Sequence, residues 1–429
     1  MTPVNFLELV SLHQGIVLIF CAMLLLAYLV IYRSGISSVA DPLFLGVIAS
    51  AFSASVIAIL VYLEEIEDFY LISFLVTESI FVAATLSCGV KSLKLRKIIP
   101  TVSEDSWYLI FHYSLVATFL VATSIYLWRV GLPLFQTSSR LITFQELGLL
   151  TWVLEVTWVG VPLSVLLKRN FLSKKNIFDY FLLSLSFFLF ATKGGKSDIV
   201  YILFVFHVFS QVTGATSTKR FESVLLWALP AMVVVVTSVV LTTWGVEASA
   251  FKVVLERFLL FGDVFFMGYN HSFLATIPDI GFFEYFFGGI KASIYSILGY
   301  DSNERFVLGY AISEYYYGIG EGIGPNARHN ILGLVLWGPV FGVLFSALCG
   351  GAFLLCRRFV FWSGCGIFSL FIYCIINVYA WVLFIDPSLA IGYLLKIAVV
   401  ISPLVVCAYG LNFLLTFGRY SELKIGKHS

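Results

Sequence analysis

Residues 14–32 read QGIVLIFCAMLLLAYLVIY, an unbroken apolar run that contains no charged side chain. A helix needs about 20 apolar residues to cross the hydrocarbon core of a bilayer. The run therefore predicts a transmembrane helix, and similar runs recur along the chain to give about eleven expected spans. These spans cover residues 14–32, 42–62, 69–89, 107–127, 147–167, 177–191, 199–214, 223–243, 330–355, 359–382 and 388–416.

The composition also favours a chain that lies in the lipid bilayer. It is 60% hydrophobic and 12% charged, whereas soluble domains carry about 25% charged residues. The net charge of +1 excludes a strong overall attraction for nucleic acid. We therefore predict an all-α, polytopic transmembrane helix bundle. It comprises an N-terminal bundle over 1–243, a large loop over 244–329, and a C-terminal bundle with a tail over 330–429. The first bundle would hold about eight spans and the last about three.

Lys and Arg are unevenly divided between the two sides of the expected bundle. One side has most of them: Arg33, Lys91, Lys94, Arg96, Lys97, Lys168, Arg169, Lys174, Lys175, Lys219, Arg220, Arg357, Arg358, Arg419, Lys424 and Lys427. Basic residues in short connections mark the cytoplasmic side of a membrane protein. We therefore expect the C-terminus in the cytoplasm, and the N-terminus and the 244–329 loop on the outer side.

The 244–329 loop is much longer than any other connection, and long loops without a function are uncommon. Phe, Tyr and Ile occur throughout it, which is not typical of a disordered linker. Val254, Phe258, Phe261 and Phe265 share one face of a helix. This stripe predicts an amphipathic helix that lies in the headgroup plane, and a second helix is expected over 304–317.

The loop ends in a glycine-rich segment, GIGEGIGPNARHN over 318–330, directly before an expected span. Alternating glycines let a ligand approach the backbone closely. Arg328, His329 and Asn330 follow where a helix presents unpaired N–H groups, an arrangement that favours a bound diphosphate. His329 is the best-placed general base of the chain. The competing interpretation is a glycine-rich loop that ends in a helix cap.

Other cations on the outer side could bind phosphate as well. Arg140 follows Gly131-Leu132-Pro133-Leu134-Phe135, and Lys193 and Lys196 belong to the turn Lys193-Gly194-Gly195-Lys196-Ser197-Asp198. Arg257 and Arg305 lie in the large loop. Each has a simpler explanation: a snorkelling arginine for Arg140, a positively charged turn for the lysines, and surface charges for the last two.

Two sets of acidic or intramembrane charges remain. Glu64, Glu65, Glu67 and Asp68 could hold a divalent cation, although a solvated polar cap explains them at least as well; we assign no metal ligand. Glu78, Glu155 and Lys396 fall inside expected spans, where ionisable side chains are costly and are functional candidates by default. Mutual pairing inside the bundle is the alternative, and the sequence does not say which pairs form.

The arrangement resembles Wzy-type O-antigen polymerases, the oligosaccharide repeat-unit polymerases of bacterial surface polysaccharides. The first shared feature is Leu132-Pro133-Leu134-Phe135 followed by Arg140, and the second is the turn over 193–197. The third is the long outer loop that closes on Arg328-His329-Asn330, followed by a span with Gly338 and Gly342. O-antigen ligases are similar in having a large outer loop with a histidine before a late span.

The resemblance implies a GT-C-like membrane glycosyltransferase of the bacterial inner membrane that acts at the periplasmic face without a cofactor. It would transfer the growing chain from undecaprenyl diphosphate to the sugar of a new lipid-linked repeat unit. Both substrates would be undecaprenyl-diphosphate-linked oligosaccharides, and a chain-length regulator protein is a further partner that the resemblance suggests. His329 would act as the base. The residues expected to bind the diphosphates are Arg140, Lys193, Lys196, Arg257, Arg305, Arg328 and Asn330. Because the chain has no DxD motif, cations would have to stabilise the leaving group in place of a metal.

Two alternatives stay open. The first is an O-antigen ligase, and the second, from another class, is a lipid-linked oligosaccharide flippase or other secondary transporter. Transporters tend to show repeated halves with broken helices at matching positions. The long loop lies late in this chain and nothing in the first half matches it, so we prefer a polymerase or a ligase to a transporter.

Overall fold

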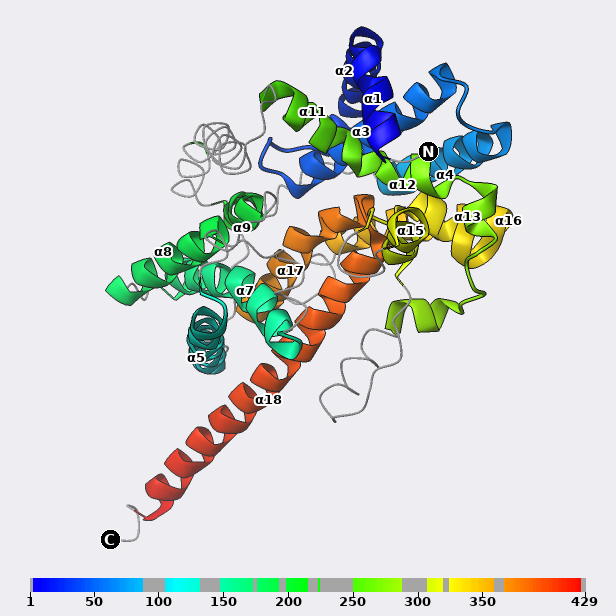
Figure 1. Ribbon diagram of the computed structural model, residues 1–429. Helices are drawn as coiled ribbons and strands as arrows, with labels where there is room; N and C mark the ends of the chain where they lie inside the picture. The colour runs from blue at the N-terminus through cyan, green and yellow to red at the C-terminus, as the bar shows by residue number, and fades with distance from the viewer. Residues whose placement is uncertain are drawn as a thin grey trace. The chain divides into compact units, whose positions relative to one another are not determined.

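Every regular element in the described part of the chain is a helix (Figure 1), which confirms the all-α prediction. The computed structural model describes residues 3–87, 105–131, 147–172, 176–192, 198–214, 223, 250–287, 307–318, 324–358 and 366–425. Eight of the helices in these ranges are long and apolar enough to cross a membrane. The chain is therefore a polytopic helical membrane protein.

The eight candidate spans coincide with eight of the predicted ones. They are α2 (Gln14–Tyr32), α3 (Pro42–Tyr62), α4 (Asp68–Leu86), α5 (Asp105–Arg129), α7 (Leu149–Phe171), α16 (His329–Arg358), α17 (Ile367–Ala380) with η5 (Trp381–Phe384), and α18 (Pro387–Ile425). Two shorter apolar helices, α8 (Ile177–Thr192) and α9 (Asp198–Thr213), lie where the short spans were expected. The predicted span over 223–243 lies outside the described residues, apart from Ser223.

Contacts within the chain define two compact units that interleave along the sequence. Unit 1 comprises residues 1–93, 223–357 and 379–392, and unit 2 comprises residues 94–222, 358–378 and 393–429. Each unit thus gathers segments that are far apart in the chain. The predicted division into consecutive bundles and a loop stays a prediction.

The helix α3 is the centre of unit 1 because its side chains are small. In the apolar stretch of α3 that could cross a membrane, 67% of the residues are buried, compared with 22% in the corresponding stretch of the neighbouring α2. A methyl group placed on Gly46 would lie 2.8 Å from the ring of Phe384 in η5. One placed on Gly262 would lie 2.9 Å from the Cα of Ser53. Small residues let membrane helices approach closely in this way, so α3 contacts both the outer-loop helices and η5.

In unit 2, α7 packs against α5, α8 and α9. His112 Nδ1 of α5 lies 2.7 Å from Ser164 Oγ of α7, a hydrogen bond between two neighbouring helices. Lys396 Nζ lies 2.7 Å from Glu155 Oε2 and pairs two of the intramembrane charges that the sequence left unassigned.

Helices occupy both segments of the large loop where the sequence predicted them. The apolar stripe lies on α11 (Ala250–Leu259), η3 (Leu260–Gly262) and α12 (Asp263–Gly268) in succession, and α15 (Leu308–Tyr317) lies within the second expected helix. The structure adds α13 (His271–Leu274) in the loop and α1 (Pro3–Leu12) before α2. The stripe faces protein: Phe258 stacks on Phe52 of α3 at 4.8 Å, and Phe265 meets Phe74 of α4 edge-on at 5.1 Å. The side chain of Val254 and residues 288–306, which include the start of the second expected helix, lie outside the described part. The location in the headgroup plane stays a prediction.

The helix at the predicted span over 330–355 is interrupted, because α16 is broken at Gly338. This glycine has φ 72° and ψ −177°, and Pro339 follows it. His329 Nδ1 lies 3.0 Å from Ser346 Oγ, although residues this far apart in a straight helix would be about 25 Å apart. The chain therefore folds back on itself. We call residues 329–337 the short arm and residues 339–358 the long arm of this hairpin.

Gly333 and Gly342 allow the two arms to touch. A methyl group on Gly333 would lie 2.9 Å from the carbonyl oxygen of Gly342. The long arm is about 30 Å long and can cross a bilayer by itself, whereas the short arm, at about 13 Å, cannot. At the far end of the long arm, Arg357 forms a two-pronged ion pair with Asp41, with N–O distances of 2.7 and 3.1 Å. Asp41 also caps α3 by accepting from the N–H of Leu43.

Candidate functional site

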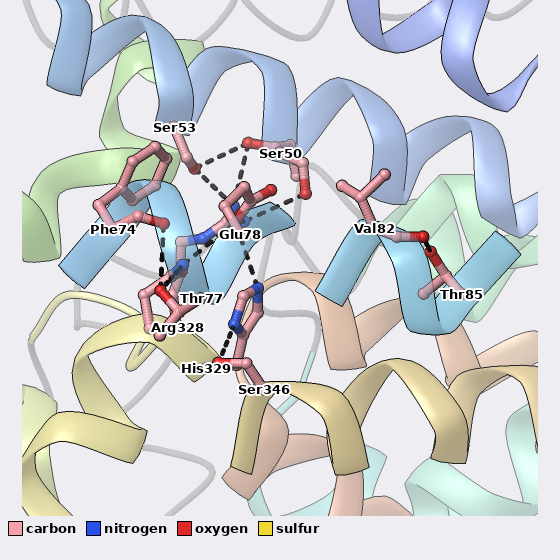
Figure 2. A network of polar contacts seen from close by, with 12 residues as sticks. Ser50, Ser53, Phe74, Thr77, Glu78, Val82, Thr85, Arg328, His329 and Ser346 are labelled. Atoms are coloured by element: carbon pink, nitrogen blue, oxygen red, sulfur yellow. Dashed lines mark hydrogen bonds and ion pairs between the residues drawn. The ribbon is translucent and has the colours of Figure 1, made fainter. Parts of the chain in front are cut away.

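A buried polar cluster lies in unit 1 where the short arm of α16 begins, and Glu78 of α4 is at its centre (Figure 2). We call it the Glu78 cluster. It is formed by Tyr28, Ser50, Ser53, Thr77, Glu78, Arg328, His329, Asn330 and Ser346.

The Glu78 carboxylate is surrounded by groups that can donate a hydrogen bond. Tyr28 donates from its hydroxyl to Oε1 at 2.7 Å, and Asn330 donates from Nδ2 to Oε2 at 3.2 Å. Arg328 Nη2 lies 3.5 Å and His329 Nε2 lies 3.3 Å from the same Oε2 atom. A carboxylate surrounded by donors in this way is stabilised as an ionised acceptor.

Arg328 is fully buried, with 0% of its surface exposed. It donates to Ser53 Oγ at 2.7 Å, to Ser50 Oγ at 3.1 Å and to the carbonyl oxygen of Ala49 at 3.3 Å, all on α3. Phe265 of α12 lies on another side, with its ring centre 5.9 Å from the guanidinium carbon. Arg328 therefore joins α3, α4 and α12 around one charge.

His329 is also 0% exposed, and three neighbours fix its ring. Nε2 faces Glu78, Nδ1 faces Ser346 of the long arm, and the ring stacks on Phe81 of α4 at 4.1 Å with an angle of 12°. Figure 2 shows the ring between Glu78 and Ser346. The histidine thus connects the short arm both to α4 and to the long arm.

The backbone before Arg328 is held by two separate contacts. The chain passes so close to α15 here that a side chain at Gly324 would collide with the backbone of Gly309, and one at Gly309 would collide with the carbonyl oxygen of Pro325. The N–H of Ala327 donates to Asp386 Oδ2 at 3.2 Å. The other oxygen of Asp386 caps α18 by accepting from the N–H groups of Ser388 and Leu389. These contacts fix the backbone so that Arg328 and His329 lie against α4.

The energetics make this cluster unusual for a membrane bundle. A buried charge is expensive unless it is paired and hydrogen-bonded. Here one carboxylate meets one guanidinium, so the opposite charges compensate each other. Three atoms of the cluster are buried and have no hydrogen-bond partner among the described residues: Arg328 Nε, His329 Nε2 and Asn330 Oδ1. A donor, an acceptor and a ring nitrogen therefore remain for a ligand or a water molecule.

Only some of the predicted site residues lie in the cluster. Arg328, His329 and Asn330 come together in the Glu78 cluster, whereas Arg257 is exposed on α11. Arg140, Lys193, Lys196 and Arg305 lie outside the described residues. The role of all these cations in binding diphosphate stays a prediction. Among the residues that the structure describes, no group of three or more His, Cys, Asp or Glu side chains could hold a metal ion.

Sequence reasoning marked Glu78 as a candidate without finding its partners, and it missed Tyr28 and Ser346. Glu78 was visible because it is an acid within an apolar run. Tyr28 and Ser346 gave no such signal, because tyrosine and serine are ordinary residues in membrane helices. Their part in the cluster depends on how α2, α4 and the hairpin pack.

No protein-family model, no curated protein and no solved structure matches this chain.

Proposed function

We propose that this protein is a polysaccharide polymerase that joins oligosaccharide repeat units carried on undecaprenyl diphosphate at the periplasmic face of the inner membrane. The observation that carries the proposal is the Glu78 cluster. A base, a fixed cation and the start of a broken helix meet there, buried inside the helices of unit 1. Ionisable groups at such a position are costly and are usually kept for function.

The chemistry that the proposal requires is glycosyl transfer. The acceptor sugar hydroxyl attacks the anomeric carbon of the donor sugar, and the bond from that carbon to the diphosphate oxygen breaks. The electron pair leaves with the diphosphate. His329 accepts the proton of the attacking hydroxyl, and the Arg328 guanidinium stabilises the charge on the departing diphosphate.

The cluster is closed in the described conformation, so substrate must open it. Arg328 and His329 are both 0% exposed, and Glu78 occupies the position that an anionic substrate would take beside Arg328. In this proposal, the diphosphate displaces Glu78 from Arg328, while His329 keeps its contacts with Glu78 and Ser346.

The broken helix also favours a second candidate, a transporter of lipid-linked oligosaccharides. Transporters bind substrates at interrupted helices whose half-helix ends face buried charges, and the short arm of α16 has this character. Transport needs no general base, so this second candidate function gives His329 no chemical role.

The length distribution of surface polysaccharide in a strain that lacks this protein separates the candidates. A single repeat unit on the lipid core means a polymerase. Polymer that stays on undecaprenyl diphosphate means a ligase, and repeat units that accumulate on the cytoplasmic side mean a flippase.

The His329→Ala variant then tests the chemistry. A general base contributes about 10²–10⁴-fold to a rate, so this variant should make no long polymer although it is inserted at normal levels. His271→Ala is the matched control, since His271 is an exposed histidine in the large loop. Near-normal polymer from the His329→Ala variant would contradict the proposed mechanism.

A further inference from the structure

We propose that Ser346, His329 and Glu78 form a proton relay, in which Ser346 takes the proton of the acceptor hydroxyl and passes its own to His329. The proposal rests on the proposed function, because it assumes that His329 acts as the base. It adds Ser346 as a group that touches the substrate and Glu78 as a positioning residue.

The first step of the argument is that both ring nitrogens of His329 face a polar neighbour, Nδ1 through a hydrogen bond and Nε2 at ion-pair distance. Nε2 lies 3.3 Å from Glu78 Oε2, and Nδ1 lies 3.0 Å from Ser346 Oγ. Phe81 covers one face of the ring at 4.1 Å. A substrate hydroxyl therefore cannot reach either nitrogen directly without displacing a partner.

The second step is the assignment of the protons. Tyr28, Asn330 and Arg328 all direct donors at the Glu78 carboxylate, so its oxygens act as acceptors. A carboxylate that only accepts requires the hydrogen of a neutral imidazole on the nitrogen that faces it. That nitrogen is Nε2. Nδ1 then carries the lone pair, and the hydroxyl of Ser346 donates to it.

The third step follows from this tautomer. The basic nitrogen of His329 is Nδ1, and the hydroxyl of Ser346 occupies its lone pair. The proton of the acceptor hydroxyl moves to Ser346 Oγ as the new glycosidic bond forms, while the proton of Ser346 moves to Nδ1. Ser346 is unchanged at the end, and His329 becomes an imidazolium beside the Glu78 carboxylate. The diphosphate leaves with the electron pair of the broken bond, and the imidazolium later releases its proton to water.

Ser346 has a competing structural role, because its bond to His329 joins the two arms of the α16 hairpin. The two roles differ in what replaces the serine. If Ser346 only joins the two arms by a hydrogen bond, its loss should lower the stability of the protein. If Ser346 relays a proton, it needs a hydroxyl group, and its loss should lower the turnover rate.

The experiment uses the purified full chain in nanodiscs. The substrate is the lipid-linked repeat unit extracted from the strain that lacks the protein, and the product is followed by gel. Ser346→Ala should lower kcat by roughly 10²-fold with KM unchanged, and Ser346→Thr should restore most of the loss because it keeps a hydroxyl. Glu78→Gln should also lower kcat, by about 10²-fold or more, because its amide can donate to Nε2 and move the ring hydrogen to Nδ1.

Ser164→Ala is the matched control. It removes another buried serine–histidine contact, the 2.7 Å contact with His112 in unit 2, and should leave kcat unchanged. Normal kcat in Ser346→Ala, or a Ser346→Thr variant as slow as Ser346→Ala, overturns the relay. If His329→Ala abolishes turnover while Ser346→Ala does not, only the relay is wrong. If His329→Ala itself is active, the proposed function fails as well.

Discussion

The ion pair between Glu78 and Arg328 should dominate the stability of unit 1, and removal of one charge should cost far more than removal of both. The nearest nitrogen and oxygen of the pair are 3.5 Å apart. At an effective dielectric constant of about 20, two unit charges at this distance attract by ~5 kcal/mol. Loss of one partner from a buried pair typically costs about 3–5 kcal/mol, so both estimates have the same size.

The two single variants should not be equal. Glu78→Gln keeps the shape of the side chain but leaves the Arg328 guanidinium without a counter-charge, and a guanidinium stays protonated in proteins. Arg328→Met leaves the Glu78 carboxylate, which can bind a proton and become neutral. We therefore expect Glu78→Gln to lower the free energy of unfolding by about 3–5 kcal/mol and Arg328→Met by less.

The double variant gives the decisive comparison. Because no charge stays buried in it, the combined change should cost clearly less than the sum of the two single changes, and the coupling energy should be several kcal/mol. The measurement is unfolding of the purified protein in detergent, followed by tryptophan fluorescence. The Lys396–Glu155 pair of unit 2 is the matched control, because its side chains are 20% and 15% exposed and its coupling should be smaller. Additive costs of Glu78→Gln and Arg328→Met would refute this account of the cluster.

The other predictions concern the backbone and one further carboxyl group. Asp386→Ala removes the cap of α18 and leaves the Ala327 N–H unpaired, and should lower the free energy of unfolding by about 1–3 kcal/mol in the same assay. Gly338→Ala should by itself lower the free energy of unfolding by ~1–3 kcal/mol, since φ 72° with ψ −177° is almost confined to glycine. Gly342→Val should push the hairpin arms apart, whereas Gly351→Val should be tolerated because a Cβ at Gly351 meets no atom within 4 Å; equal losses would argue against the hairpin. Burial raises the pKa of Asp263 to about 8, so the folded state binds this proton more tightly than the unfolded chain, and stability should fall as pH rises from about 4 towards 8. Asp263→Asn should remove that part of the pH dependence in thermal unfolding.

The sequence by itself determined that the chain crosses a membrane with helices, and where eight of them lie. The physical reason is local: in hydrocarbon the backbone must satisfy its own hydrogen bonds, so a long apolar run becomes a helix whatever its neighbours are. The same reasoning predicted helices in the large loop, because the Phe258–Phe265 stripe is a property of one segment.

The sequence also marked Arg328, His329 and Asn330, since a glycine-rich segment before a helix is visible in the chain itself. Only the tertiary structure decided that Glu78 lies between them and that Ser346 holds the far side of His329. Those contacts depend on the reversal at Gly338, which brings Ser346 back beside His329, and on Arg328, which joins α3 to α4. The conformation of Gly338 cannot be predicted from hydropathy, because residues on both sides of it are apolar and helical. The pairing of charges across the bundle was undetermined for the same reason: it is set by packing between segments, not by the character of any one segment.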